Sequence, residues 1–197
     1  MPLGEAVRFR RRTLSALLAG ALIAIGFGVG PSAEAAPDDR LQRLLAHNPG
    51  SRLAGPDSII TEQGVTLSLP SSTKANAKAA GVPDTLCSYE HLCLFSDAEF
   101  SGEKLTVGTD CDVFPIWQLK MSNGRYWGNE VSSYINNQKA GTWAFMWNNY
   151  GAIDTADRNN WELIEGSRAA GKGLAQGVAW MPRNDMVNVV RPCPGPW

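Results

Sequence analysis

The sequence predicts an all-β sandwich that is preceded by a small helix-and-hairpin extension. From Thr85 onward, short apolar runs alternate with clusters of Gly, Asn and Asp, at the spacing of about 8 to 12 residues that is typical of β-sandwiches. None of these runs keeps a helical period over its length. All four cysteines and all seven tryptophans also lie beyond this point. We therefore expect residues 85–197 to form one β domain.

The first 35 residues have the pattern of a secretory signal peptide. Four arginines fall within Arg8–Arg12, an apolar run covers Leu14–Val29, and small residues at Ala33–Ala35 fit a signal-peptidase site. The alternative, a membrane anchor, is disfavoured because glycines interrupt the apolar run. Residues 1–35 are therefore predicted to be removed, which leaves a secreted, extracellular chain with no membrane attachment.

Residues 36–69 are predicted to form the extension. A short helix is expected over residues 36–48, because three leucines recur there at helical spacing and Asn48-Pro49-Gly50 can end it. Two short strands are expected at Ser58–Thr61 and Val65–Leu69, joined by a polar turn that contains a glycine. The Pro-bounded, small and polar residues 70–84 are expected to be a linker.

Composition excludes several classes of function. The formal net charge of -1 argues against nucleic acid as a partner, because binding to phosphates needs a basic face. Only two histidines are present, and the sequence has no HExxH, GxSxG or Gly-rich phosphate loop. We therefore expect a protein that is not an enzyme and needs no cofactor.

A hairpin motif and two polar loops carry the most information. Phe95 is followed by four residues, Phe100, one residue and Gly102. Gly102 allows an unusual φ, and the two rings can stack over the turn. Further on, Gly128–Tyr134 carries a polar loop into a strand, and Asn184–Val189 occupies a similar place near the end of the chain.

These residues resemble the βγ-crystallin-like fold, and more narrowly the secreted actinobacterial peptidase-inhibitor family typified by the Streptomyces metalloproteinase inhibitor. The resemblance covers about residues 85–150. It implies a Greek-key sandwich, a peptidase inhibitor that acts through a rigid exposed loop, and an extracellular protease as partner. The residues that carry it are the pair Cys87 and Cys93, Leu94-Phe95, Phe100-Ser101-Gly102, Cys111 and Val131–Trp143.

The sequence also departs from the family pattern. Trp147–Gly151 is a degenerate version of the hairpin motif. The resemblance implies a reactive bond on a short loop that a disulfide closes within the second half. That half holds only Cys193, so such a loop cannot close there locally. No reactive bond is therefore named. The candidate exposed loops are Gln118–Trp127 and Ile153–Asn160. The alternative function is a non-inhibitory extracellular binding or structural module, for which calcium is a candidate stabilising ion. The sequence does not predict an oligomeric state.

The even number of cysteines in an exported chain predicts two disulfides. Resemblance favours Cys87–Cys93, which leaves Cys111–Cys193. A hairpin centred near Ala98 would instead bring Cys87 close to Cys111, so this second pairing stays open.

The polar loops are also candidate calcium ligands. Their side chains and carbonyls supply the oxygen atoms that a hard cation prefers, although each loop departs from the family pattern at some positions. The competing interpretation is an ordinary Asn/Ser turn that satisfies backbone groups. The candidate ligands are Asn129, Glu130, Ser132, Asn184 and Asp185.

The seven tryptophans have two interpretations. They could form a platform that stacks on carbohydrate, but in a small β-sandwich they more often fill the core. We expect core positions for most of them, and expect Trp127 and Trp197 to be the exposed ones.

Overall fold

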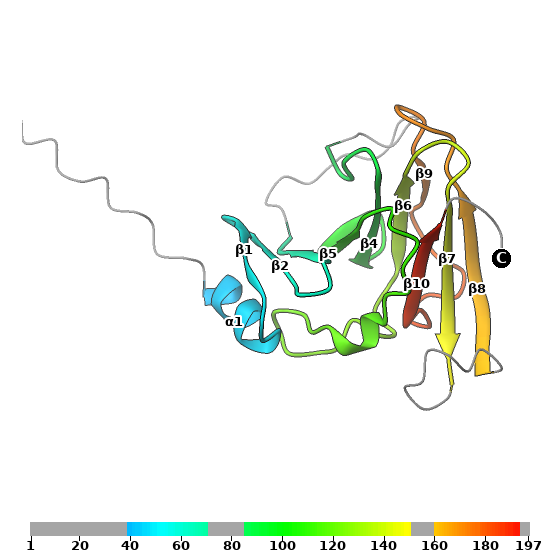
Figure 1. Cartoon of the computed structure of the whole chain (residues 1–197). Helices are drawn as coiled ribbons and strands as arrows, with labels where there is room; N and C mark the ends of the chain where they lie inside the picture. The colour runs from blue at the N-terminus through cyan, green and yellow to red at the C-terminus, as the bar shows by residue number, and fades with distance from the viewer. Residues whose placement is uncertain (1–38, 71–84, 151–159, 194–197) are drawn as a thin grey trace, which may run out of the picture. The chain divides into compact units, whose positions relative to one another are not determined.

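The computed structural model describes residues 39–70, 85–150 and 160–193 (Figure 1). The predicted signal peptide, residues 1–35, lies outside this part of the chain, as does the predicted linker except for Pro70. All of the described residues belong to one compact unit, Ala36–Trp197. None of the helices within it is long and apolar enough to span a membrane.

The described chain consists mostly of antiparallel strands in two sheets, with one small N-terminal helix, which confirms the predicted fold class. The helix α1 covers Asp39–His47 and buries Leu41 and Leu44. The first sheet has the strand order β1-β2-β3-β5-β4-β6-β9. Its strands are β1 Arg52–Gly55, β2 Ser58–Ile60, β3 Thr66–Ser68, β4 His91–Asp97, β5 Ser101–Val107, β6 Ser133–Asn137 and β9 Gln176–Val178.

The second sheet has three strands, in the order β10-β7-β8. They are β7 Trp143–Asn149, β8 Trp161–Arg168 and β10 Val189–Cys193. A short 3-10 helix, η1 Ile116–Gln118, lies between β5 and β6 in the sequence.

Each half of the β domain is a Greek key whose third segment crosses to the other sheet. In the first half β4 pairs with β5 and β6 returns beside β4; in the second half β7 pairs with β8 and β10 returns beside β7. The third strand of the second half, β9, pairs with β6 in the first sheet. The matching segment of the first half is Phe114, which bridges to Val190 of β10. This reciprocal exchange, which was not predicted, links the two sheets. The two Greek keys themselves confirm the predicted Greek-key sandwich.

The extension continues the first sheet instead of standing apart from it. Strand β3 pairs with β5, and Leu67 lies opposite Leu105. Both leucines are fully buried in the main core cluster, together with Leu41 and Leu44 of α1. The predicted helix and hairpin are therefore confirmed, and they share their core with the β domain.

Successive side chains point to opposite faces of a strand, so the two faces of one strand pack into different hydrophobic clusters. On β4, Leu92 and Leu94 enter the main core, whereas Cys93 and Phe95 lie in a second cluster. On β7, Met146 enters the main core. The opposite face of β7 carries stacked rings, in which Trp143 and Phe145 are 5.5 Å apart and Phe145 and Trp147 are 5.6 Å apart. These rings pack mainly against each other and their neighbours, as expected for core aromatics.

The two disulfides are Cys87–Cys93 and Cys111–Cys193. This is the pairing that the resemblance implied, and the alternative between Cys87 and Cys111 is excluded. The second disulfide joins β10 to the segment that follows β5.

The prediction that Trp127 is exposed is wrong. Its side chain is 0% exposed and lies in the main core cluster. The chain also packs tightly at the following residue, where a Cβ on Gly128 would lie 2.7 Å from Cβ of Trp117. Among the tryptophans that the structure describes, the exposed one is Trp180, at 73%. Trp197 lies outside the described residues.

Candidate functional site

The loop Gln118–Trp127 is a closed turn. The amide of Trp127 donates to the carbonyl of Leu119 at 2.8 Å, and the amide of Met121 donates to the carbonyl of Arg125 at 2.8 Å. Gly124 sits at the tip with a φ of 86°, a conformation that glycine adopts without strain. The loop therefore has an internal hydrogen-bonded frame.

The loop divides into buried anchors and an exposed tip. Met121, Ser122 and Trp127 are buried. Asn123, Arg125 and Tyr126 are exposed, and Tyr126 keeps 53% of its surface accessible. The tip is therefore available to a partner, while both ends of the turn are fixed in the core.

A buried carboxylate holds the middle of the loop. Glu103, on β5, is 5% exposed. The amide of Ser122 donates to its two carboxylate oxygens at 3.2 and 3.1 Å, and the hydroxyl of Ser122 donates to Oε1 at 2.5 Å. Nη2 of Arg40 lies 3.9 Å from the same oxygen. This charge is buried at low cost because donors surround it.

A second buried side chain, Asn48, holds the start of the loop. Its Oδ1 accepts from the amide of Lys120 at 2.9 Å, and its Nδ2 donates to the carbonyl of Lys120 at 2.8 Å. The two residues are 72 positions apart in the sequence. Nζ of Lys120 lies 4.8 Å from the ring centroid of Tyr126, so the same residue also supports the tip.

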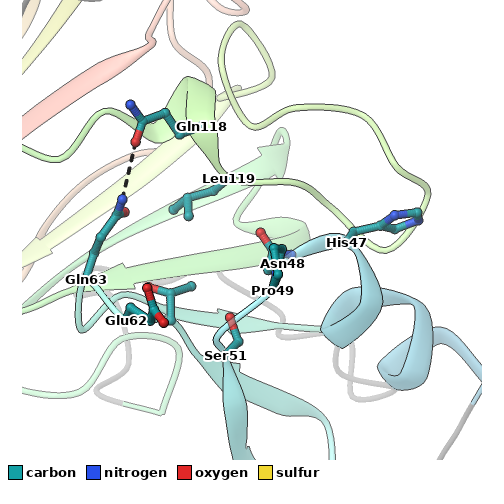
Figure 2. A pocket seen from close by; sticks show the side chains of 9 residues that line it. His47, Asn48, Pro49, Ser51, Glu62, Gln63, Gln118 and Leu119 are labelled. Atoms are coloured by element: carbon teal, nitrogen blue, oxygen red, sulfur yellow. Dashed lines mark hydrogen bonds between the residues drawn. The ribbon is translucent and has the colours of Figure 1, made fainter.

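A small hollow lies beside the first residues of the loop (Figure 2). Its volume is about 220 Å³. Gln63 reaches across from the turn between β2 and β3, and its Nε2 donates to Oε1 of Gln118 at 3.3 Å. The hollow is lined by His47, Asn48, Pro49, Ser51, Thr61, Glu62, Gln63, Gln118 and Leu119. The extension therefore contacts the loop through the end of α1 and through its hairpin turn.

The two polar loops proposed as calcium ligands meet each other. The amide of Asn129 donates to the carbonyl of Val187 at 3.0 Å, and the amide of Asp185 donates to the carbonyl of Val131 at 3.1 Å. Asn129 and Asp185 both have positive φ, 65° and 59°. Ser132 of the first loop contacts the second loop, because its hydroxyl donates to Oδ1 of Asp185 at 3.4 Å.

Four of the five candidate ligands have side chains that are already engaged within the chain, namely Glu130, Ser132, Asn184 and Asp185. Glu130 forms an ion pair with Arg125 of the loop tip, and Asn184 donates to Oδ2 of Asp185 at 3.1 Å. Within residues 39–70, 85–150 and 160–193, no group of three or more His, Cys, Asp and Glu is arranged to hold a metal ion. Any calcium site here would depend on carbonyl, amide and hydroxyl oxygens, and it stays a prediction.

The pKa of Glu130, where the two loops meet, is shifted. Burial raises the pKa of Glu130 above its ordinary value; Arg125 opposes this, while the charges of Asp185 and Asp97 raise it further. Two acidic side chains therefore act on Glu130 against a single neighbouring cation.

The predicted hairpin motif has the expected geometry. The rings of Phe95 and Phe100 meet edge to face, with centroids 5.9 Å apart. Gly102 has a φ of 78°, and a Cβ there would lie 2.1 Å from Oγ of Ser96. That hydroxyl accepts from the amide of Glu103 at 2.9 Å. The glycine is therefore required both for its φ and for this close approach.

Two supports of the loop were missed in the sequence. At Asn48 the sequence indicates only the end of a helix. Glu103 carried a usable signal, because it shares the inward phase of its strand with Leu105 and Val107. A carboxylate in that phase indicates a buried polar contact. Of the two predicted loops, Gln118–Trp127 is described, whereas Ile153–Asn160 lies outside the described residues except for Asn160.

The comparison with protein-family models agrees with the resemblance seen in the sequence. Residues 82–153 match the model of the peptidase inhibitor family I36, which supports a peptidase-inhibitor role and a protease partner in general. No match was found among curated proteins. A solved structure described as "Evolution of the eye lens beta-gamma-crystallin domain fold" aligns with 57% of this chain and 90% of its own, at 16% identity and a TM-score of 0.37.

Proposed function

We propose that this protein is a secreted inhibitor of an extracellular protease and that it inhibits by inserting the loop tip Asn123–Tyr126 into the protease cleft. The observation that carries the proposal is the contrast within the loop, where the exposed tip is flanked by buried, hydrogen-bonded anchors. The family match over residues 82–153 supports the inhibitory role.

Preorganisation is the physical basis of this mechanism. A flexible loop loses conformational entropy when a protease orders it, which costs about 0.5–1.5 kcal/mol for each immobilised side chain. In this chain the backbone of Lys120 is held by Asn48, and Ser122 is held by Glu103. Most of the ordering is therefore complete before the protease binds. Tyr126 offers the partner an exposed aromatic ring, a type of side chain that often dominates interface energies.

The test is a titration of the mature chain against a panel of thermolysin-like metalloproteases and serine proteases. We expect saturable inhibition of at least one protease in the panel, with the loop left intact or cleaved at a single bond. Absence of inhibition at micromolar concentrations across the panel would remove the proposal.

A second candidate function is a non-inhibitory extracellular module that calcium stabilises. It is favoured by the meeting of the two polar loops, where burial raises the pKa of Glu130, Arg125 opposes this, and the charge of Asp185 on the second loop adds to the rise. Calcium would bind through Asn129, Ser132, Asp185 and nearby carbonyls. Calorimetric titration with calcium, together with thermal unfolding in calcium and in chelator, tests this function. A melting temperature that is identical in both conditions would argue against it.

A further inference from the structure

The extension supplies the contacts that fix the start of the proposed inhibitory loop. Residues 39–69 precede the region that matches the inhibitor family, yet Asn48 and Gln63 both bond to residues of the loop. His47 lies against its tip, because a Cβ on Gly124 would be 3.4 Å from Nε2 of His47. The extension therefore contacts the loop both at its start and at its tip.

The backbone of Lys120 needs a partner outside the loop. Lys120 and Tyr126 form an antiparallel bridge, and the hydrogen bonds of that bridge are made by the flanking pairs Met121 with Arg125 and Trp127 with Leu119. In such a pair the N–H and C=O groups of the central residue point away from the opposite strand. Those of Lys120 point to Asn48, whose amide takes the place of a neighbouring strand.

The side chain of Asn48 matches this task group for group. A carboxamide offers two N–H donors and one carbonyl acceptor. Nδ2 donates to the carbonyls of Leu44 and Lys120, both at 2.8 Å, and Oδ1 accepts from the amide of Lys120. Asn48 is 5% exposed, so water cannot easily replace these bonds. An aspartate would lose both donors, and an alanine would lose all three bonds.

The extension is itself rigidly anchored, so it can transmit this constraint. Leu41 and Leu44 of α1 are 2% and 0% exposed in the main core, and Leu67 of β3 pairs across the sheet with Leu105. The end of α1 therefore has a fixed position relative to β5, which carries the other anchor, Glu103.

We propose that Asn48 is a positioning residue and that the extension is a built-in clamp that holds the loop in its binding conformation. This inference rests on the proposed inhibitory function. It predicts that loss of the Asn48 bonds weakens inhibition through mobility of the loop, although Asn48 does not itself reach the exposed tip.

The test compares Asn48→Ala with a matched control, Asn136→Ala. Asn136 is also a fully buried asparagine, but its side chain bonds to Ser167 and Gln138. In Asn48→Ala we expect the amide of Lys120 to exchange with deuterium at least about tenfold faster, after correction for global stability, and the inhibition constant to rise at least about tenfold. The control should show neither change beyond its effect on global stability.

Several results would overturn the clamp. One is unchanged exchange at Lys120 in Asn48→Ala, and another is a loss of inhibition no greater than in Asn136→Ala. If Asn48→Ala does not fold, hydrogen exchange in the unaltered chain still tests the clamp. The clamp requires that the amide of Lys120 be protected from exchange as strongly as the amide of Trp127. If the unaltered chain inhibits no protease, the proposed function fails, while the exchange measurements still judge the clamp.

Discussion

Two buried polar side chains, Asn48 and Glu103, determine the conformation of the exposed loop. Each is 5% exposed, and each bonds to backbone groups that the loop cannot pair internally. Buried polar groups of this kind stabilise one conformation only if their partners stay in place. Their substitution should therefore be costly.

Glu103→Ala should destabilise the protein by about 1–3 kcal/mol, because it leaves the buried amide of Ser122 without an acceptor. Glu103→Gln keeps one acceptor oxygen and should cost less. Urea unfolding of the two variants and the unaltered chain measures both effects. An alanine variant that is as stable as the unaltered chain would contradict this description of the loop.

Glu130→Gln should change how stability depends on pH. The pKa of Glu130 is raised above 4.5 by burial, so between that value and its folded pKa the folded chain holds a proton that the unfolded chain has released. Stability of the unaltered chain therefore falls as pH rises through this window. The free energy of unfolding of the variant minus that of the unaltered chain should therefore be larger at neutral pH than in acid. Urea unfolding of both proteins at the two pH values measures this difference. The opposite sign would show that the ion pair with Arg125 dominates.

At the scale of elements, leucine spacing and apolar alternation were sufficient for the helix and two strands of the extension. The helix α1 and the strands β2 and β3 lie where leucine spacing and apolar alternation place them. Strand β1, Arg52–Gly55, was not predicted, because its residues show no apolar alternation and its burial pattern is largely exposed. It becomes a strand by pairing with β2 in a hairpin, and the propensities of its own residues do not encode that pairing.

Leu67→Ala on β3 should destabilise the whole β domain by about 2–5 kcal/mol, because this leucine is fully buried between the extension and β5. Chemical unfolding followed by tryptophan fluorescence measures it, since all seven tryptophans lie outside the extension. Leu53→Ala, at a residue that is 51% exposed on β1, is the matched control and should change little. If Leu67→Ala left the fluorescence transition unmoved, the extension would be a separate folding unit.

The whole molecule is held together by exchange between its two halves. Strand β9 joins the first sheet, Phe114 joins β10, and the Cys111–Cys193 disulfide adds a covalent link between the same halves. The sequence indicated the repeat through its hairpin motif and polar loops. Periodicity could not predict which strand pairs with which, because the exchange joins segments that are distant in the chain.

The two disulfides should contribute unequally to stability. Their sequence separations are 82 for Cys111–Cys193 and 6 for Cys87–Cys93. The chain-entropy model assigns about 4–5 kcal/mol to the longer loop and about 2 kcal/mol to the shorter one. Paired Cys→Ser variants, compared by urea unfolding, test this ranking. A larger loss from the Cys87–Cys93 pair would show that local packing outweighs loop entropy.

The sequence predicted the position of the candidate loop but not the contacts that hold it. The sequence selected Gln118–Trp127 as an exposed loop, and the structure places an exposed tip there. The phase of its strand marks Glu103 as buried, but the partners of the two anchors could not be deduced, because Asn48 lies 72 residues from Lys120 and Glu103 lies 19 residues from Ser122. Burial of Trp127 was missed for the same reason, since only the folded chain shows what closes around it.

The inhibition constant of Tyr126→Ala, compared with that of Trp180→Ala, tests the central claim most directly. Both residues are exposed aromatics, at 53% and 73%, so neither substitution should unfold the chain, but only Tyr126 belongs to the proposed inhibitory tip. We expect Tyr126→Ala to raise the inhibition constant at least about tenfold, while Trp180→Ala leaves it nearly unchanged. Equal effects of the two substitutions, or a loss confined to Trp180→Ala, would contradict inhibition through this loop.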